Sequence, residues 1–166
     1  MKDQLSFYRI TAAQLAELPD RDFLVDRELT GYFERHGQFI DDLWLDKVFM
    51  GDFLGPMGTI LGGGVDALIG RSGNLIQPSG PTIYTTHLPQ GELKMIIKTL
   101  SQGRKILRGL DDNASTDHHN RLHQLATEQF GSANRLAAHI HAVQRLVERG
   151  RGKAELMSVY VRWGKG

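Results

Sequence analysis

Histidine is the most concentrated reactive side chain in this sequence, because five of its seven histidines fall within the stretch DHHNRLHQLATEQFGSANRLAAHIHAV. The five are His118, His119, His123, His139 and His141. His119 and His123 are four residues apart, the spacing at which two imidazoles on one face of a helix can bind a metal ion. His139 and His141 are two residues apart and point about 160° away from each other on a helix, so at most one of them can join the first pair.

A metal site with three protein ligands would combine His119 and His123 with Asp117 or His139. The sequence contains no His-Glu-x-x-His motif. The apolar periodicity of the second histidine-bearing helix places His139 at the flank of its buried stripe and His141 toward solvent. We therefore expect these histidines at the border and surface of helices, with no metal and no cofactor, and the metal site stays open as the alternative.

A glycine-rich stretch and one further histidine offer a second kind of chemistry. The stretch GPMGTILGGGVDALIGRSGN resembles a phosphate cradle in composition, but it lacks the Gly-Lys-Ser/Thr ending of a P-loop. We expect a long irregular loop over residues 51–80. An enzyme or small-ligand-binding protein would use this loop over a pocket, with His87, His119 or His123 as proton carriers or metal ligands. No serine has a Gly-x-Ser-x-Gly setting, and the absence of a coherent catalytic set favours a protein that is not an enzyme.

The composition narrows the class of protein further. The chain has no cysteine, which excludes disulfides, thiolate nucleophiles and cysteine-ligated metal clusters. No signal peptide or membrane-spanning run is present in the sequence, so we expect a cytoplasmic protein that does not enter a membrane. Residues 1–66 carry six Lys/Arg against twelve Asp/Glu, and the other 100 residues carry fourteen against seven. The net charge of +1 argues against a nucleic-acid partner.

Periodicity and turn signals predict the elements that position these residues. Strands are expected at Leu5–Ile10, Thr82–Thr86 and within AELMSVYVRW. Helices are expected in TAAQLAELPD, where Thr11 and Gln14 have capping-box spacing, in RDFLVDREL, in FIDDLWLDKVFMGDFL, in PQGELKMIIKTLSQG up to Gly103, and on each side of Gly131. These elements predict an α+β fold in which residues 1–166 form a single compact domain, with a small, mostly antiparallel sheet packed with about five or six helices.

The stretch FIDDLWLDKVFMGDFL suggests a binding surface. Its acidic and aromatic side chains are those that protein interfaces use at charged rims and apolar anchors. The candidate binding residues are Asp41, Asp42, Trp44, Asp46, Phe49, Asp52 and Phe53. We expect a non-enzymatic binding protein, of the toxin-neutralising (immunity) type or an accessory protein, that occludes a surface of a protein partner such as a bacterial toxin.

Three stretches together resemble the YfbM-like family of small bacterial proteins, whose function is not established. They are SFYRITAAQLAEL, LWLDKVFMGDFL and GPTIYTTHLPQGELKMIIKTL, and the closing order of a helix followed by AELMSVYV is also similar. The resemblance implies a small α+β domain and no particular activity. The chain departs from the family pattern at Phe49, where the family has tryptophan, and at Asp52–Phe53, where the family has Leu-His. A function that depends on that family histidine is therefore not implied at this position.

Overall fold

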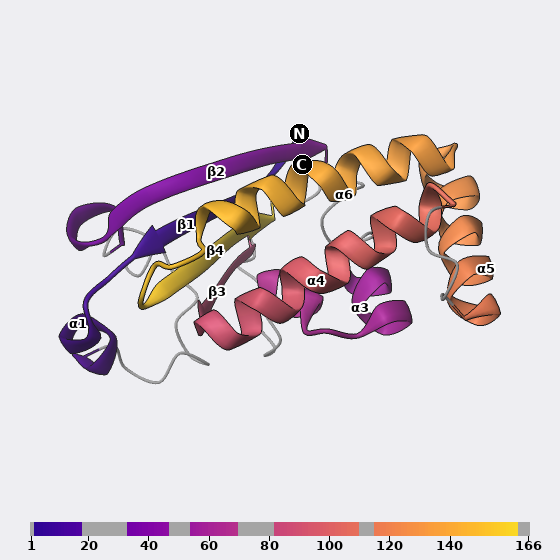
Figure 1. Ribbon diagram of the computed structural model, residues 1–166. Helices are drawn as coiled ribbons and strands as arrows, with labels where there is room; N and C mark the ends of the chain where they lie inside the picture. The colour runs from indigo at the N-terminus through magenta and orange to yellow at the C-terminus, as the bar shows by residue number, and fades with distance from the viewer. Residues whose placement is uncertain (1, 18–32, 47–53, 70–81, 110–114, 163–166) are drawn as a thin grey trace.

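The computed structural model describes residues 2–17, 33–46, 54–69, 82–109 and 115–162, and they form the α+β fold that the sequence predicts (Figure 1). The sheet has four strands in the order β2-β1-β4-β3, and every neighbouring pair is antiparallel. The strands are β1 (Lys2–Arg9), β2 (Gln38–Asp46), β3 (Thr82–Leu88) and β4 (Leu156–Arg162). The sheet is therefore antiparallel throughout, and the described residues belong to one compact domain.

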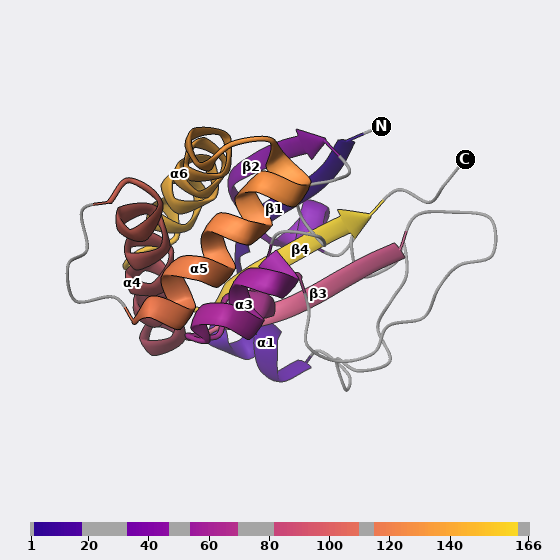
Figure 2. The same ribbon diagram turned by 90° about the vertical axis from the view of Figure 1, so that its right-hand side faces the viewer.

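The helices gather mainly on one face of the sheet. They are α1 (Ala12–Glu17), α3 (Gly55–Leu61), the 3-10 helix η3 (Val65–Ile69), α4 (Gln90–Leu107), α5 (Thr116–Leu125), the π-helical turn η4 (Ala126–Phe130) and α6 (Ala133–Arg149). Figures 1 and 2 show α4 and α6 side by side over the sheet, with α5 across the end where α4 finishes. Within the described ranges, no helix is long and apolar enough to span a membrane.

The side chains of β1 and β4 alternate between the two faces of the sheet, so the sheet separates two apolar clusters. Leu5 and Phe7 of β1 are buried in the large core beneath the helices. Met157 and Val159 of β4 are buried in a smaller cluster with Phe33. Successive side chains of a strand point to opposite faces, so a strand covered on both sides reads as a continuous apolar run. This is why the C-terminal strand was predictable from AELMSVYVRW.

The helix predicted over FIDDLWLDKVFMGDFL is wrong in the part that the structure describes, because Gln38–Asp46 is the strand β2. β2 pairs with β1, and Leu43 lies opposite Leu5. Aromatic and branched residues fit a half-buried strand, and pairing with a distant segment overrides the helical spacing of Leu43, Met50 and Leu54. Residues 47–53 lie outside the described residues.

The glycine-rich stretch over residues 51–80 is also more ordered than predicted, since α3 and η3 lie within it. Pro56 stands in the first turn of α3, where its missing N–H removes no helical hydrogen bond. Met57 of the same helix is fully buried. A short helix therefore forms where an apolar side chain can be buried, and residues 51–53 and 70–80 lie outside the described residues.

Helix α4 does not end at Gly103 as predicted but continues to Leu107. A Cβ atom at Gly103 would lie 2.8 Å from Cε of Met57, so this glycine allows α3 to approach α4 closely. The other local predictions on described residues are confirmed. Thr11 and Gln14 form a reciprocal capping box with bonds of 2.9 and 3.1 Å, and Gly131 separates the two histidine-bearing helices with a φ of 82°. The helix predicted in RDFLVDREL lies outside the described residues.

Candidate functional site

The histidines are distributed over different surfaces of the helical layer. The rings of His119 and His123 on α5 lie 4.3 Å apart between centroids. His139 on α6 is half-buried and meets Phe130 edge-on, whereas His141 is exposed. The carboxylate of Asp117 lies 3.8 Å from Arg121. In the part of the chain that the structure describes, no three histidine or acidic side chains are grouped as metal ligands would be.

His87 occupies a different end of the molecule from the other candidate histidines. It lies at the end of β3, just before α4 begins, and α5 lies across the opposite end of α4 (Figure 1). Its Nε2 is 3.1 Å from Oε2 of Glu155, and the two side chains are 20% and 26% exposed. Glu155 has a φ of 52°, a left-handed conformation that is uncommon for a residue other than glycine. The fold therefore places His87 next to Glu155, away from His119 and His123.

Strand β2 carries the described members of the predicted binding set. It lies at an edge of the sheet as far as the described strands show. Trp44 is 47% exposed, and Phe39, which the sequence analysis did not select, is 53% exposed. Asp42 Oδ2 accepts hydrogen bonds from Gln4 Nε2 and from the indole N–H of Trp44, each at 3.1 Å. The carboxylate of Asp42 therefore fixes the orientation of Trp44 on this edge.

Not all of the predicted binding residues can be placed. Asp46 is the last residue of β2, and its side chain is not described. Phe49, Asp52 and Phe53 lie outside the described residues. Asp41, Asp42 and Trp44 are thus the predicted residues that the structure brings together, and Phe39 extends their surface. Period-two alternation places Phe39 on the face of Asp41, but the register shift between the pairs Phe7–Asp41 and Tyr8–Phe39 breaks that alternation, so the sequence pattern alone could not place Phe39 beside Trp44.

A β2–α6 hollow lies behind this edge strand. It has a volume of about 210 Å³ and is lined by Asp41, Asp42 and Leu43 on β2 and by Ala142, Arg145 and Arg149 on α6, among others. Nε of Arg149 lies 3.7 Å from Oδ2 of Asp41. The side chain of Arg149 is 65% exposed and that of Asp41 is 37% exposed. Arg149 of this hollow therefore faces a carboxylate, and the ion pair is open to solvent.

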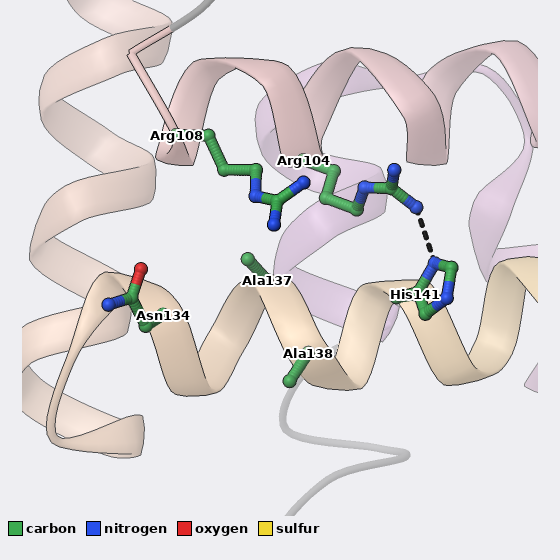
Figure 3. A pocket seen from close by; sticks show the side chains of 6 residues that line it. All are labelled: Arg104, Arg108, Asn134, Ala137, Ala138 and His141. Atoms are coloured by element: carbon green, nitrogen blue, oxygen red, sulfur yellow. Dashed lines mark hydrogen bonds between the residues drawn. The ribbon is translucent and has the colours of Figure 1, made fainter.

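An α4–α6 hollow, which the sequence analysis missed, has a volume of about 300 Å³. Its described lining residues are Arg104 on α4, Arg108 at the C-cap directly after α4, and Asn134, Ala137, Ala138 and His141 on α6 (Figure 3). Nη1 of Arg104 contacts Nδ1 of His141 and donates to Oε1 of Gln144 at 3.3 Å. Of the described residues that line the hollow, three are basic and none is acidic. The only sequence signal for this hollow is the spacing of Arg104 and Arg108, which places both on one face of α4.

The fold alters the ionisation of Tyr8. Burial raises the pKa of the Tyr8 phenol above its ordinary value of 10.0, and the negative charges of Glu34 and Asp42 raise it further. The ring of Tyr8 lies 5.6 Å from that of Phe39, in an edge contact. The phenol therefore stays neutral beside the β2 edge at neutral pH.

Comparison of the chain with family models, with curated proteins and with solved structures gives no match. The resemblance to the YfbM-like family stays a prediction from the sequence. Function must accordingly be argued from the β2 edge, from the histidines and from the two hollows.

Proposed function

We propose that this chain is a non-enzymatic binding protein that covers a surface of a protein partner, as toxin-neutralising (immunity-type) and accessory proteins do. The observation that carries the proposal is the edge strand β2, on which the exposed aromatic side chains of Phe39 and Trp44 accompany Asp41 and Asp42. An edge strand offers unpaired backbone groups that a second chain can use by adding a strand. Exposed aromatic residues are frequent anchors of protein interfaces.

The partner is expected to present an extended segment with basic side chains. Asp42 supplies negative charge beside Trp44 on β2, and the indole of Trp44, held by Asp42, supplies apolar contact area. Complementary charge sets the encounter rate and the register, and the aromatic anchors supply most of the affinity. The proposed setting is the cytoplasm, and a bacterial toxin is one such partner.

The experiment is capture of partners from a native lysate by the tagged chain, with variants that separate this edge from other apolar surfaces. Phe39→Ser and Trp44→Ser remove exposed aromatic groups from β2. Met95→Ser is the matched control, because Met95 is also 53% exposed but lies on α4. The proposal expects a stoichiometric protein that Met95→Ser retains and that both β2 variants lose. Equal retention by all three variants contradicts it.

A second candidate function, a small-ligand-binding protein or enzyme, is favoured by the pair His87–Glu155 alone. A half-buried imidazole held by a carboxylate can carry a proton or bind a polar ligand. The two functions differ in which NMR signals respond. A metabolite that shifts the ring signals of His87 and leaves the indole signal of Trp44 unchanged supports the second candidate. A captured protein that shifts Trp44 and not His87 supports the first.

A further inference from the structure

We infer that the α4–α6 hollow is a binding site for a small phosphate-bearing anion, independent of the β2 edge. Two guanidinium groups, from Arg104 and Arg108, enter this hollow from α4 (Figure 3). Guanidinium groups bind phosphate oxygens through charge-assisted hydrogen bonds, often two at a time. The inference rests on the balance of charge in the hollow, on the fixed position of one arginine and on the available space.

The positive charge of the hollow is not neutralised by its described neighbours. The described acceptors of Arg104 are His141 Nδ1 and Gln144 Oε1, and neither belongs to a carboxylate. Arg108 forms no ion pair or hydrogen bond through its side chain with any described residue. The nearest acidic group in this network is Glu148, whose Oε1 accepts from Gln144 at 3.5 Å outside the hollow. Two like charges four residues apart on a helix repel each other, and a bound dianion removes that repulsion.

Arg104 is held in place before any ligand binds. Nη1 of Arg104 contacts Nδ1 of His141, and because an arginine N–H can only donate, this ring nitrogen is the acceptor of the contact. The second acceptor, Gln144, lies one turn further along α6. A side chain that is already ordered loses less conformational entropy on binding a ligand. His141 is therefore a positioning residue for Arg104.

The opposite wall of the hollow favours an anion as well. Asn134 lies in the first turn of α6, where helix N–H groups carry partial positive charge. The small side chain of Ala137 projects toward the arginines and leaves space between them and α6 (Figure 3). A hollow of about 300 Å³ lies at the lower end of the range of small-molecule sites. The ligand class is thus a phosphate monoester with a small organic group.

The test is an NMR titration of the full chain with inorganic phosphate, methyl phosphate and acetate at constant ionic strength. Both phosphates are expected to shift the amide signals of Asn134 and Ala138 saturably, and acetate is expected to bind more weakly. Arg108→Gln is expected to weaken phosphate binding roughly tenfold or more, because it removes a charge-assisted contact. Lys105→Gln is the matched control: Lys105 is also a basic residue in the last turn of α4, but it does not line the hollow, and its loss should change the affinity less than about twofold.

The role of His141 has its own control. His141→Ala is expected to weaken phosphate binding, and His141→Asn is expected to restore it in part, because an amide oxygen can accept the bond from Arg104. The inference is overturned if phosphate causes no saturable shift or if acetate binds as tightly as phosphate. Equal weakening by Lys105→Gln and Arg108→Gln also overturns it, since that result indicates general charge attraction. Capture of a protein through β2 leaves each of these outcomes unchanged, so the two proposals fail separately.

Discussion

The two hollows along α6 have similar lining residues but differ in the balance of positive and negative charge. Each contains two arginines four residues apart, Arg104 and Arg108 in one and Arg145 and Arg149 in the other, and each includes at least one alanine of α6. The β2–α6 hollow also contains Asp41 and Asp42, whereas no carboxylate is among the described residues that line the α4–α6 hollow. Two arginines four residues apart can therefore form structural ion pairs where β2 supplies carboxylates. They can bind a ligand anion where α4 supplies no carboxylate.

The largest effect is expected from a substitution that disrupts the packing of α4. This helix lines the α4–α6 hollow and not the β2–α6 hollow. A Cβ atom at Gly63 would lie 1.8 Å from Oγ1 of Thr99 on α4, and the φ of Gly63 is 71°. Gly63→Ala should lower the free energy of unfolding by about 3 kcal/mol, through backbone strain and overpacking together. Denaturant unfolding measures the change.

Gly62 provides the control for this substitution. Its φ is 70°, but a Cβ atom there would meet nothing within 4 Å. Gly62→Ala should therefore cost only the backbone strain, about 1 kcal/mol. Equal losses for the two variants would show that the approach of Gly63 to α4 contributes nothing.

The next effect makes the α4–α6 hollow resemble the β2–α6 hollow. Ala138 is exposed and lines the hollow, so Ala138→Asp introduces a carboxylate beside the two arginines without changing the core. Phosphate affinity should fall about 100-fold, because an internal anion replaces the external one and repels it. Ala138→Asn introduces a side chain with the shape of aspartate but without its charge, and it should retain most of the phosphate binding in the same NMR titration. Unchanged affinity in Ala138→Asp would place phosphate elsewhere.

A smaller effect is expected when the β2–α6 hollow is made to resemble the α4–α6 hollow. Asp41→Asn removes the charge that faces Arg149 and should create weak phosphate binding at Arg145 and Arg149, detected as new shifts of the Ala142 amide. The free energy of unfolding should change by less than about 0.5 kcal/mol, because the ion pair is solvent-exposed. A loss above about 2 kcal/mol would contradict this description of the pair.

The smallest effect concerns Tyr8 beside the β2 edge. Its raised pKa leaves stability independent of this group below pH 10.0; above that value the unfolded chain loses the phenolic proton first, and stability falls as the pH rises through the folded-state pKa. Asp42→Asn should lower the pKa of Tyr8 slightly, because Asp42 contributes less than burial and Glu34. Ultraviolet absorbance titration of the phenol measures this shift. Glu34→Gln should lower the pKa of Tyr8 more than Asp42→Asn does. A larger decrease in Asp42→Asn would contradict this order of the two charges.

Features of the fold that depend on residues close in sequence were predicted, and features that depend on distant residues were not. The capping box of Thr11 and Gln14 and the amphipathic helix α4 depend on residues close in sequence, and both were predicted. Strand β2 was missed because its pairing with Leu5 is non-local, and because Leu43, Met50 and Leu54 have helical spacing in the sequence. The end of α4 was misplaced because Gly103 serves a contact with Met57 that no local pattern reveals.

The candidate site shows the same limit. Asp41, Asp42 and Trp44 were selected for their residue types, and the structure places them together on β2 rather than on a helix. The α4–α6 hollow could not be found from sequence, since Arg104 and His141 are separated by 37 residues and each has the pattern of a solvated helix face. Only the packing of the two helices brings these side chains into contact.

The position of β1 between β2 and β4 has a consequence for the order in which the chain can fold during synthesis. Gln4 pairs with Val161, so the centre of the sheet joins segments from opposite ends of the described chain. Until β4 has left the ribosome, β1 can pair only with β2, and its other edge stays open to foreign strands. The helical layer can assemble earlier from local contacts, and closure of the sheet by β4 should then be the slow, late step.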